Sequence, residues 1–402
     1  MSAVGRLLLC VVTLLGVTMA GTAAAQDVVT STLNKHNLSS SGPGPVKTNA
    51  TTEVCIFCHA PHNSSPTAPL WNQTLSGATY TPYTSTTMAA AANVPTGSSK
   101  LCLSCHDGTI AVASTLSRGQ ITMSGVTNGV LAGASNIGTN LTSSHPVSIV
   151  PVTGSEIINP PAGHAVGLDA TGRLQCVSCH DPHQMNADAT THKFLAMGNA
   201  SSALCVTCHR KQYWTSNPSS HMTSTKAYVA AQGAHTGYTT VATNGCESCH
   251  KVHLAAQGPH ILKAREELTC GGTGSQCHST TGIGRNIHAE FNKTYSHPTY
   301  SITPSVHDPA ESPTSVTAPL PERTAGTPRH AECGDCHNAH ASYNAAATAP
   351  KASGKLAGVW GINRTGAMVL PSGTPSSVNE YEICFKCHGD SANLPQGTGG
   401  PA

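Results

Sequence analysis

The chain has few of the large apolar side chains from which protein cores are built. Its 402 residues include 4 Phe and 3 Trp, and aromatic residues make up only 4% of the sequence. A chain of this length normally buries a large apolar core in roughly one to three domains. Gly, Ala, Ser and Thr are abundant instead, so we expect another group to supply the buried apolar mass.

An excess of charge of one sign is also absent. The sequence has 21 Lys and Arg against 19 Asp and Glu, a formal net charge of +2 at pH 7. A nearly neutral surface excludes electrostatic binding of nucleic acid as the main function. It also offers no polybasic patch for anionic membranes.

No apolar run reaches the ~20 residues that a membrane helix needs. The run 7–19 follows Arg6 and precedes three small residues at 23–25, which predicts a secretory signal peptide over residues 1–25 and a mature chain that begins at Gln26. Cys10 lies in the discarded run. We therefore expect an exported protein without a transmembrane segment, located in the periplasm, on the outer surface or outside the cell.

The remaining cysteines form eight pairs, and a histidine directly follows the second cysteine of every pair. Seven pairs have the spacing C-x-x-C-H, whereas the pair in "CGGTGSQCH" has a longer spacer. In chain order, and numbered here as sites one to eight, they are Cys55/Cys58/His59, Cys102/Cys105/His106, Cys176/Cys179/His180, Cys205/Cys208/His209, Cys246/Cys249/His250, Cys270/Cys277/His278, Cys333/Cys336/His337 and Cys384/Cys387/His388.

C-x-x-C-H is the attachment signature of c-type haem. The thiols form thioethers with the haem, and the adjacent imidazole is the proximal ligand of the iron. A disulfide framework or C-x-x-C zinc sites are the alternatives, but neither needs a histidine after every second cysteine. For Cys270 and Cys277, a local disulfide beside a His278 that binds no haem remains an alternative. The glycine-rich insert can arch away, however, and leave the two thiols at the usual separation. We expect eight covalent c-type haems (haem c, with iron), which would also supply the missing apolar mass.

The odd-numbered sites alone carry a second histidine three residues after the proximal one. These histidines are His62, His183, His253 and His340. The even sites read CHDG, CHRK, CHST and CHGD. This alternation predicts four copies of a two-haem module, with boundaries at 26–118, 119–212, 213–286 and 287–402, the last with a flexible C-terminal tail.

The second histidine of each CHxxH segment must serve a different haem from the first. Residues three apart share one face of a helical turn, so His62 cannot reach the far side of the haem that His59 ligates. We predict that His62 ligates the haem of site two. By the same reasoning, His183, His253 and His340 ligate the haems of sites four, six and eight, and a solvated surface histidine is the alternative.

The odd-numbered haems then need distal ligands from elsewhere in the chain. Each module has a histidine upstream of its odd site, and the candidates are His36, His145, His221 and His297. His235 competes with His221, and His288, His307 and His330 compete with His297. Methionine can also ligate haem iron, but the histidines suffice for every axial position.

The segments "KHNLSSSGPG", "EVCIFCHAPHNSSPTAPLWN", "SKLCLSCHDGTIA", "SSHPVSIV", "LQCVSCHDPH" and "CVTCH" resemble exported multihaem cytochromes c with a doubled CxxCH motif, which are abundant in metal-reducing bacteria. The resemblance covers the haem-bearing chain, here with eight motifs. It implies covalent haem and a CHxxH histidine that serves a neighbouring haem. The class includes electron carriers and subunits of extracellular haem filaments. The spacer at Cys270 departs from its common pattern.

The expected fold has little regular secondary structure. We predict mostly coil with short α-helices at the haem motifs, such as 101–106 and 203–212, folded around a chain of eight covalent haems. Segments 119–160 and 299–330 are rich in Gly, Ser, Thr, Asn and Pro and are expected to be surface loops.

The expected function is electron transfer through eight bis-histidine haems, with no catalytic residue. The expected partners are other redox proteins or extracellular electron acceptors, with self-association into filaments as a further possibility. The alternative is an octahaem reductase or oxidase of small nitrogen or sulfur compounds. Such enzymes usually mark the active haem by a lysine in place of the proximal histidine or by a missing distal ligand. All eight motifs here end in histidine, which leaves the Cys270 haem as the candidate active site.

Overall fold

The computed structural model describes residues 33–66, 68, 70–85, 87–184, 193–211, 214, 219–228, 237–271, 277–297, 299, 331–372, 377–386 and 388. The predicted signal peptide, Cys387 and the C-terminal tail lie outside the described residues, as does nearly all of the predicted loop 299–330.

Regular secondary structure is short and scattered along the described chain. The α-helices are α1 (Gly97–His106), α2 (Cys176–Cys179), α3 (Ala203–Val206), α5 (Val241–Asn244), α6 (Glu266–Cys270), α7 (His288–Phe291), α8 (Cys333–Cys336) and α9 (Glu380–Cys384). The 3-10 turns are η1 (Cys55–Phe57), η2 (Gly133–Ser135), η4 (Ala200–Ser202), η6 (Gly245–Ser248), η7 (Pro259–Ile261) and η9 (Gly354–Leu356).

Two antiparallel hairpins complete the regular structure of the described residues. Strands β1 (Ser114–Thr115) and β2 (Gly119–Gln120) pair Ser114 with Gln120. Strands β3 (Gly361–Ile362) and β4 (Met368–Val369) pair Gly361 with Val369. The prediction of little regular structure with short helices at the motifs is confirmed.

The helices are short because most of them are single turns that overlap a haem motif. At site one the backbone N–H of His59 donates to the Cys55 carbonyl at 2.8 Å, so the motif itself closes one turn. Isolated helices shorter than ~12 residues are marginal in water, and the Gly- and Ser-rich sequence beyond the motifs does not extend them. The predicted helix 101–106 lies within α1.

The predicted helix 203–212 is too long, because α3 ends at Val206. The N–H of His209 still donates to the Cys205 carbonyl at 2.9 Å, but the next N–H, that of Arg210, donates to the Glu156 carbonyl at 2.8 Å. Pairing with the segment around residue 157 therefore draws the chain out of the helix.

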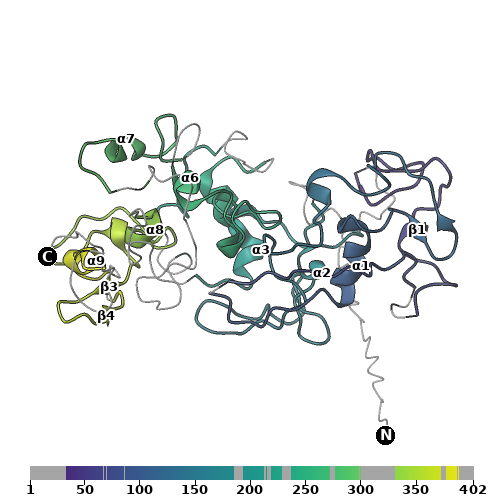
Figure 1. Cartoon of the computed structure of the whole chain (residues 1–402), viewed down its shortest axis with the longest axis horizontal. Helices are drawn as coiled ribbons and strands as arrows, with labels where there is room; N and C mark the ends of the chain where they lie inside the picture. The colour runs from purple at the N-terminus through teal and green to yellow at the C-terminus, as the bar shows by residue number, and fades with distance from the viewer. Residues whose placement is uncertain are drawn as a thin grey trace, which may run out of the picture.

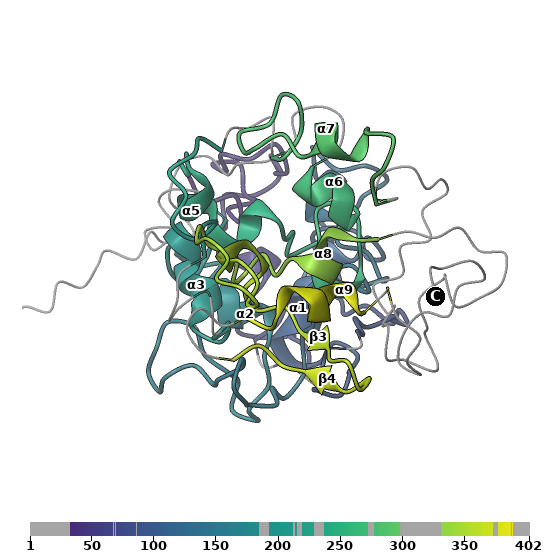
Figure 2. The same cartoon turned by 90° about the vertical axis from the view of Figure 1, so that its left-hand side faces the viewer.

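The molecule is elongated, and its long axis follows the order of the sequence. In Figure 1 the colours pass from purple at the right, near β1, through teal around α2 and α3 to yellow at α9 on the left. Figure 2 looks along this axis and has α8, α9, β3 and β4 nearest the viewer. The first and last haem motifs therefore lie at opposite ends of the molecule.

The apolar core is divided into small clusters. Phe57, Val112, Ala113 and Ile121 form one cluster, Ala352, Val359, Val378 and Ile383 a second, and Tyr80, Leu103 and Leu141 a third. None approaches the core expected for a chain of this size, as the scarcity of aromatic residues predicts. None of the helices in the described residues is long and apolar enough to cross a membrane.

Gln175 joins the haem motifs of sites two and three through a buried polar network. Its side-chain oxygen accepts from the hydroxyls of Ser99 at 2.5 Å and Ser148 at 3.1 Å, and its amide donates to Asp169 at 2.8 Å. Ser99 in turn accepts from the N–H of Cys176 at 3.0 Å. The network fixes α1 of site two against α2 of site three.

Gln175→Ala should destabilise the protein, because it removes the acceptor of the buried Ser99 hydroxyl and one of the two acceptors of the buried Ser148 hydroxyl. The expected loss is about 1–3 kcal/mol, measured from urea unfolding followed by circular dichroism. Gln120→Ala is the matched control, since Gln120 is exposed and should cost less. Equal losses in the two variants would contradict the structural role of Gln175.

Candidate haem-binding sites

Every described motif holds its proximal histidine by the same backbone closure. The histidine N–H donates to the carbonyl of the first cysteine at sites one, three, four, five, six, seven and eight, with N–O distances of 2.8–3.0 Å, and site two lies inside α1. Site six is included despite its spacer, because the His278 N–H reaches the Cys270 carbonyl at 2.8 Å. Its insert therefore does not disturb the turn that positions the imidazole.

Backbone carbonyls orient most of the proximal imidazoles. The Nδ1 atoms of His106, His180, His250, His278 and His337 lie 2.7–3.1 Å from the carbonyl oxygens of Ser135, Lys193, His260, Arg285 and Lys355. A carbonyl can only accept, so Nδ1 carries the proton. Nε2 is then the ring nitrogen that can bind a metal, the arrangement usual for metal-binding histidines.

The proximal imidazoles face a second imidazole at seven sites. The ring centroids are 6.0–6.2 Å apart in the pairs His59–His183, His36–His106, His180–His253, His145–His209, His250–His340, His221–His278 and His297–His388. An imidazole nitrogen binds a metal at about 2.0–2.1 Å and the ring centre lies about 1 Å further, so two imidazoles on one metal have centroids ~6 Å apart. The spacing fits one iron between each pair.

The planes of the paired rings fall into two groups. At sites one, three and five the interplanar angles are 17°, 29° and 6°. At sites two, four and six they are 82°, 90° and 89°, and at site eight the angle is 56°. The odd and even sites therefore differ in the relative orientation of their imidazoles.

This pairing of imidazoles differs from the predicted order of ligation. His36, and not His62, faces His106 of site two, while His62 is exposed and faces no imidazole among the described residues. His145, His221 and His297 likewise face even-numbered sites, whereas His183, His253 and His340 face sites one, three and five. Every predicted distal histidine except His62 therefore faces a proximal histidine, but at a different site from the predicted one.

Contacts between neighbouring loops explain the reversal. The side-chain amide of Asn34 donates to the carbonyl of Pro182 at 3.1 Å, so the loop that carries His36 is fastened to the turn that carries His183. These two histidines can then serve adjacent sites, with His36 at site two and His183 at site one. The sequence spacing is compatible with either arrangement, because it requires only that the CHxxH histidine serve a haem other than that of its own motif.

The remaining candidate ligands lie apart from these pairs or cannot be placed. His235, His307 and His330 are outside the described residues. The Nδ1 atom of His288 lies 3.2 Å from the side-chain amide of Asn292. His337 is the one described proximal histidine that faces no imidazole of the described residues.

Burial keeps several paired imidazoles neutral, which is the form that binds iron. Desolvation, with smaller effects of neighbouring histidines, lowers the pKa of His36 to about 4 and that of His253 to about 4. The same causes lower the pKa of His340 to about 3. These side chains therefore need no deprotonation to act as ligands near neutral pH.

The cysteines of successive sites lie next to one another along the whole chain. The thiols of Cys102 and Cys176, of Cys205 and Cys246, and of Cys270 and Cys333 lie close enough together to shift each other's pKa values. Within the predicted modules, the thiols of Cys58 and Cys105, Cys179 and Cys208, Cys249 and Cys277, and Cys336 and Cys384 are close enough to influence each other's pKa values. The attachment points thus form one continuous series from site one to site eight.

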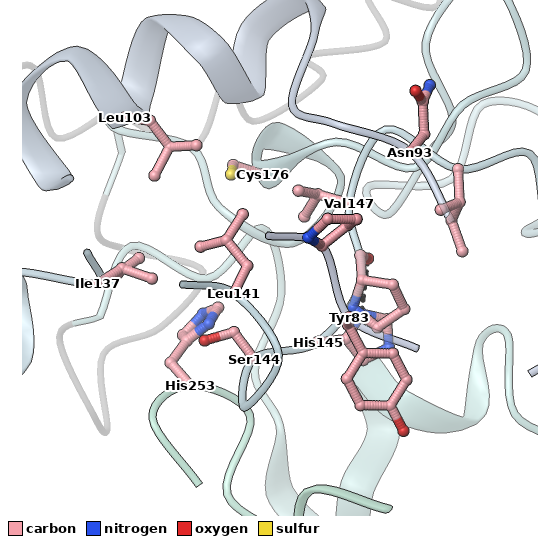
Figure 3. A pocket seen from close by; sticks show the side chains of 13 residues that line it. Tyr83, Asn93, Leu103, Ile137, Leu141, Ser144, His145, Val147, Cys176 and His253 are labelled. Atoms are coloured by element: carbon pink, nitrogen blue, oxygen red, sulfur yellow. Dashed lines mark hydrogen bonds between the residues drawn. The ribbon is translucent and has the colours of Figure 1, made fainter. Parts of the chain in front are cut away.

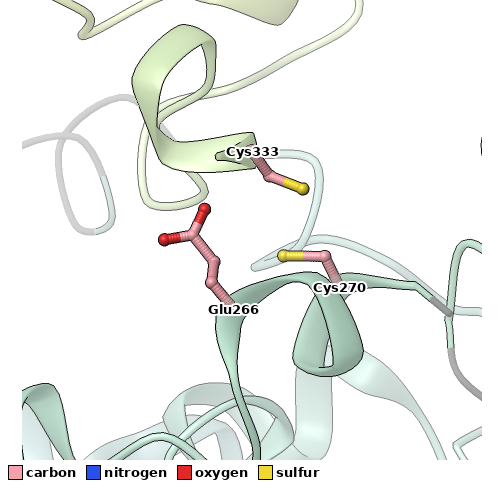
Figure 4. Close-up of side chains that lie close together, drawn as sticks. All are labelled: Glu266, Cys270 and Cys333. Carbon is pink, nitrogen blue, oxygen red and sulfur yellow. The ribbon is translucent and has the colours of Figure 1, made fainter. Parts of the chain in front are cut away.

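Figure 4 shows one junction of this series, where Cys270 and Cys333 point toward each other beside Glu266. Potential ligand atoms of the three residues lie within 4.8 Å of one another. The Glu266 carboxylate accepts the N–H of Gly334 in α8, and both thiols belong to haem motifs. The cluster is therefore the junction of sites six and seven, and Glu266 fastens the two motifs together.

A cavity lies where the haem of site three is expected. Leu103, Ile137, Leu141, Cys176 and His253 are among its lining residues. Figure 3 shows Cys176 on one side of this space and His253 on another, with the apolar side chains between them. A thiol, an opposing imidazole and an apolar wall are what a covalent haem requires.

The comparison with known proteins agrees with this geometry. Residues 170–213 match the sequence model of the family described as Doubled CXXCH motif. No curated protein matches the chain. The matched segment contains sites three and four, and it supports a multihaem c-type cytochrome in which the CXXCH motifs bind haem covalently.

We expect eight covalent haems, because site six has the same closure and the same facing imidazole as the regular motifs. Intact mass spectrometry of the exported protein should show eight haems per chain. The double variant Cys270→Ala, Cys277→Ala should show seven, and the control Cys246→Ala, Cys249→Ala should also lose one. Seven haems in the unaltered chain, with Cys270 and Cys277 joined as a disulfide, would exclude site six.

Proposed function

We propose that the protein transfers electrons along a chain of eight bis-histidine c-type haems, as part of periplasmic or extracellular electron transfer. The doubled CXXCH motif is that of multihaem cytochromes involved in electron transfer. The proposal depends on one observation. At seven of the eight motifs two imidazoles face each other, with ring centroids 6.0–6.2 Å apart.

The residues of the chain determine what a bound haem can do. Haem iron supplies one-electron redox chemistry when bound. Two opposed histidines would both hold the iron, and the protein would then offer no place for a substrate at such a site. The paired cysteines fix neighbouring haems close together, and the continuous thiol series supports an unbroken path for electrons along the long axis.

The alternative function, a reductase or oxidase of small nitrogen or sulfur compounds, needs an iron with an open position. The Cys270 site is a poor candidate for such an iron, because His221 faces His278 there. Site seven is the remaining location, since His337 faces no imidazole of the described residues. If a distal ligand also binds at site seven, no site would offer the open position that catalysis needs.

His36→Ala should convert one haem, that of site two, from low spin to high spin, because it removes the imidazole opposite His106. The reduced variant should bind one more carbon monoxide per chain than the unaltered protein, measured by optical titration. His164→Ala is the control, since His164 is exposed and faces no imidazole in the described structure. An unchanged spectrum for His36→Ala would contradict the pairing of His36 with His106.

The reduced protein should release electrons to a non-specific acceptor without turning over small substrates. Mixing it with ferricyanide should oxidise all eight haems rapidly, measured by stopped-flow absorbance. Nitrite, hydroxylamine and tetrathionate should leave it reduced over the same period, because saturated irons have no site for them. Catalytic consumption of any of the three compounds would favour the enzyme instead.

A further inference from the structure

The residue directly before the second cysteine of the motif carries a neutral hydroxyl at four of the sites. At sites two to five these residues are Ser104, Ser178, Thr207 and Ser248. Their hydroxyls bond close by, as that of Ser104 does to the Leu101 carbonyl at 2.6 Å. At site eight the same position is occupied by Lys386, which is only 3% exposed. A buried cation therefore takes the place of a neutral hydroxyl in this motif.

The ammonium of Lys386 is held between sites seven and eight by two contacts. It donates a hydrogen bond to the backbone carbonyl of Asp335, the residue directly before Cys336 of site seven. It also lies 4.8 Å from the centroid of the Trp360 ring, within the ~6 Å of cation–π contacts. A carbonyl oxygen and the face of an indole both interact favourably with a positive charge.

The close packing of α9 on β3 explains why this side chain is buried. A Cβ atom at Gly361, the first residue of β3, would lie 2.7 Å from the Cβ of Glu382 in α9. Trp360 directly precedes β3 and Lys386 follows α9, and both Figure 1 and Figure 2 show α8, α9 and β3 grouped together. Lys386 is therefore enclosed where these elements meet.

The nearby carboxylates do not cancel the charge of Lys386. Burial raises the pKa of the Cys336 thiol, and Lys386 opposes this rise more strongly than Asp335 adds to it. The carboxylate of Glu382 accepts the N–H of Asn379 at 2.8 Å, so it faces the start of α9, whereas Lys386 lies beyond its end. At a sulfur that attaches the haem of site seven, the positive charge therefore outweighs the negative one.

A buried positive charge favours the reduced form of a nearby haem. Reduction of ferric to ferrous iron adds one electron and no proton, so the charge of the haem falls by one unit while the ammonium keeps its three protons. At ~10 Å and an effective dielectric constant of ~20, one unit charge changes an equilibrium constant by on the order of tenfold. Water and salt screen an exposed charge far more, so burial is what makes a lysine effective.

We propose that Lys386 raises the reduction potentials of the haems at sites seven and eight, so that electrons moving along the chain collect at this pair. This role rests on the proposed electron-transfer function and gives the transfer a preferred destination. Each electron comes from a neighbouring haem, which is oxidised by one electron as the haem beside Lys386 is reduced. Lys386 touches no iron, and it acts on the haems through its charge.

The test is a redox titration of the full-length, haem-loaded protein, followed by the absorbance of the reduced haems. Lys386→Met removes the charge but keeps a long side chain over Trp360. The part of the curve at the highest potential, that of two haems, should move to lower potential, by on the order of tenfold in the equilibrium constant of reduction. The rest of the curve should stay in place. Lys386→Arg keeps the charge and should keep the curve of the unaltered protein.

Two further variants separate the buried charge from other effects. Lys351→Met is the matched control, because it removes the same charge from an exposed position that pairs with Asn379 beside α9. Its curve should match that of the unaltered protein. Lys386→Ser introduces the residue type of Ser104, Ser178 and Ser248, and it should shift the curve in the same direction as Lys386→Met. Intact mass should show the same number of haems in every variant.

Three results would overturn the proposal. The first is a Lys386→Met curve that matches that of the unaltered protein. The second is a Lys351→Met curve that shifts as far, because the net charge would then explain the effect. The third is a Lys386→Arg curve that shifts like that of Lys386→Met, since packing and not charge would then set the potential.

The spectrum of the unaltered protein separates these failures from a failure of the proposed function. Low-spin haems together with any of the three results would leave electron transfer through bis-histidine haems standing and remove only the role of Lys386. High-spin haems throughout the unaltered protein would contradict the proposed function, and with it the role of Lys386 that rests on it.

Discussion

The opposition of two imidazoles about 6 Å apart is the interaction on which the rest of the structure depends. Each pair joins segments that are remote in sequence, as His59 and His183 do, while the haem itself is expected to be covalently attached to one of them. Binding of a metal group by such ligands contributes directly to folding, because the unfolded chain has no preformed site. The small apolar clusters and single-turn helices then need only position these crosslinks, which is why a chain with so few aromatic residues can have an ordered structure.

The sequence predicts the chemistry of the sites better than their connections. The C-x-x-C-H spacing and the alternation of CHxxH identify the residues that the structure places opposite one another. They do not identify the partner, because His62 or His36 could each reach site two as far as spacing is concerned. The choice depends on contacts such as the bond from Asn34 to Pro182, which no periodicity indicates. The network of Gln175 escapes prediction for the same reason, since a lone glutamine carries no pattern.

The alternation that is visible in the sequence has a counterpart in the ring planes. Nearly parallel imidazoles at sites one, three and five contrast with nearly perpendicular ones at sites two, four and six. Axial ligation is one of the means by which a protein adjusts haem iron. The chain would therefore present two alternating electronic environments to a passing electron.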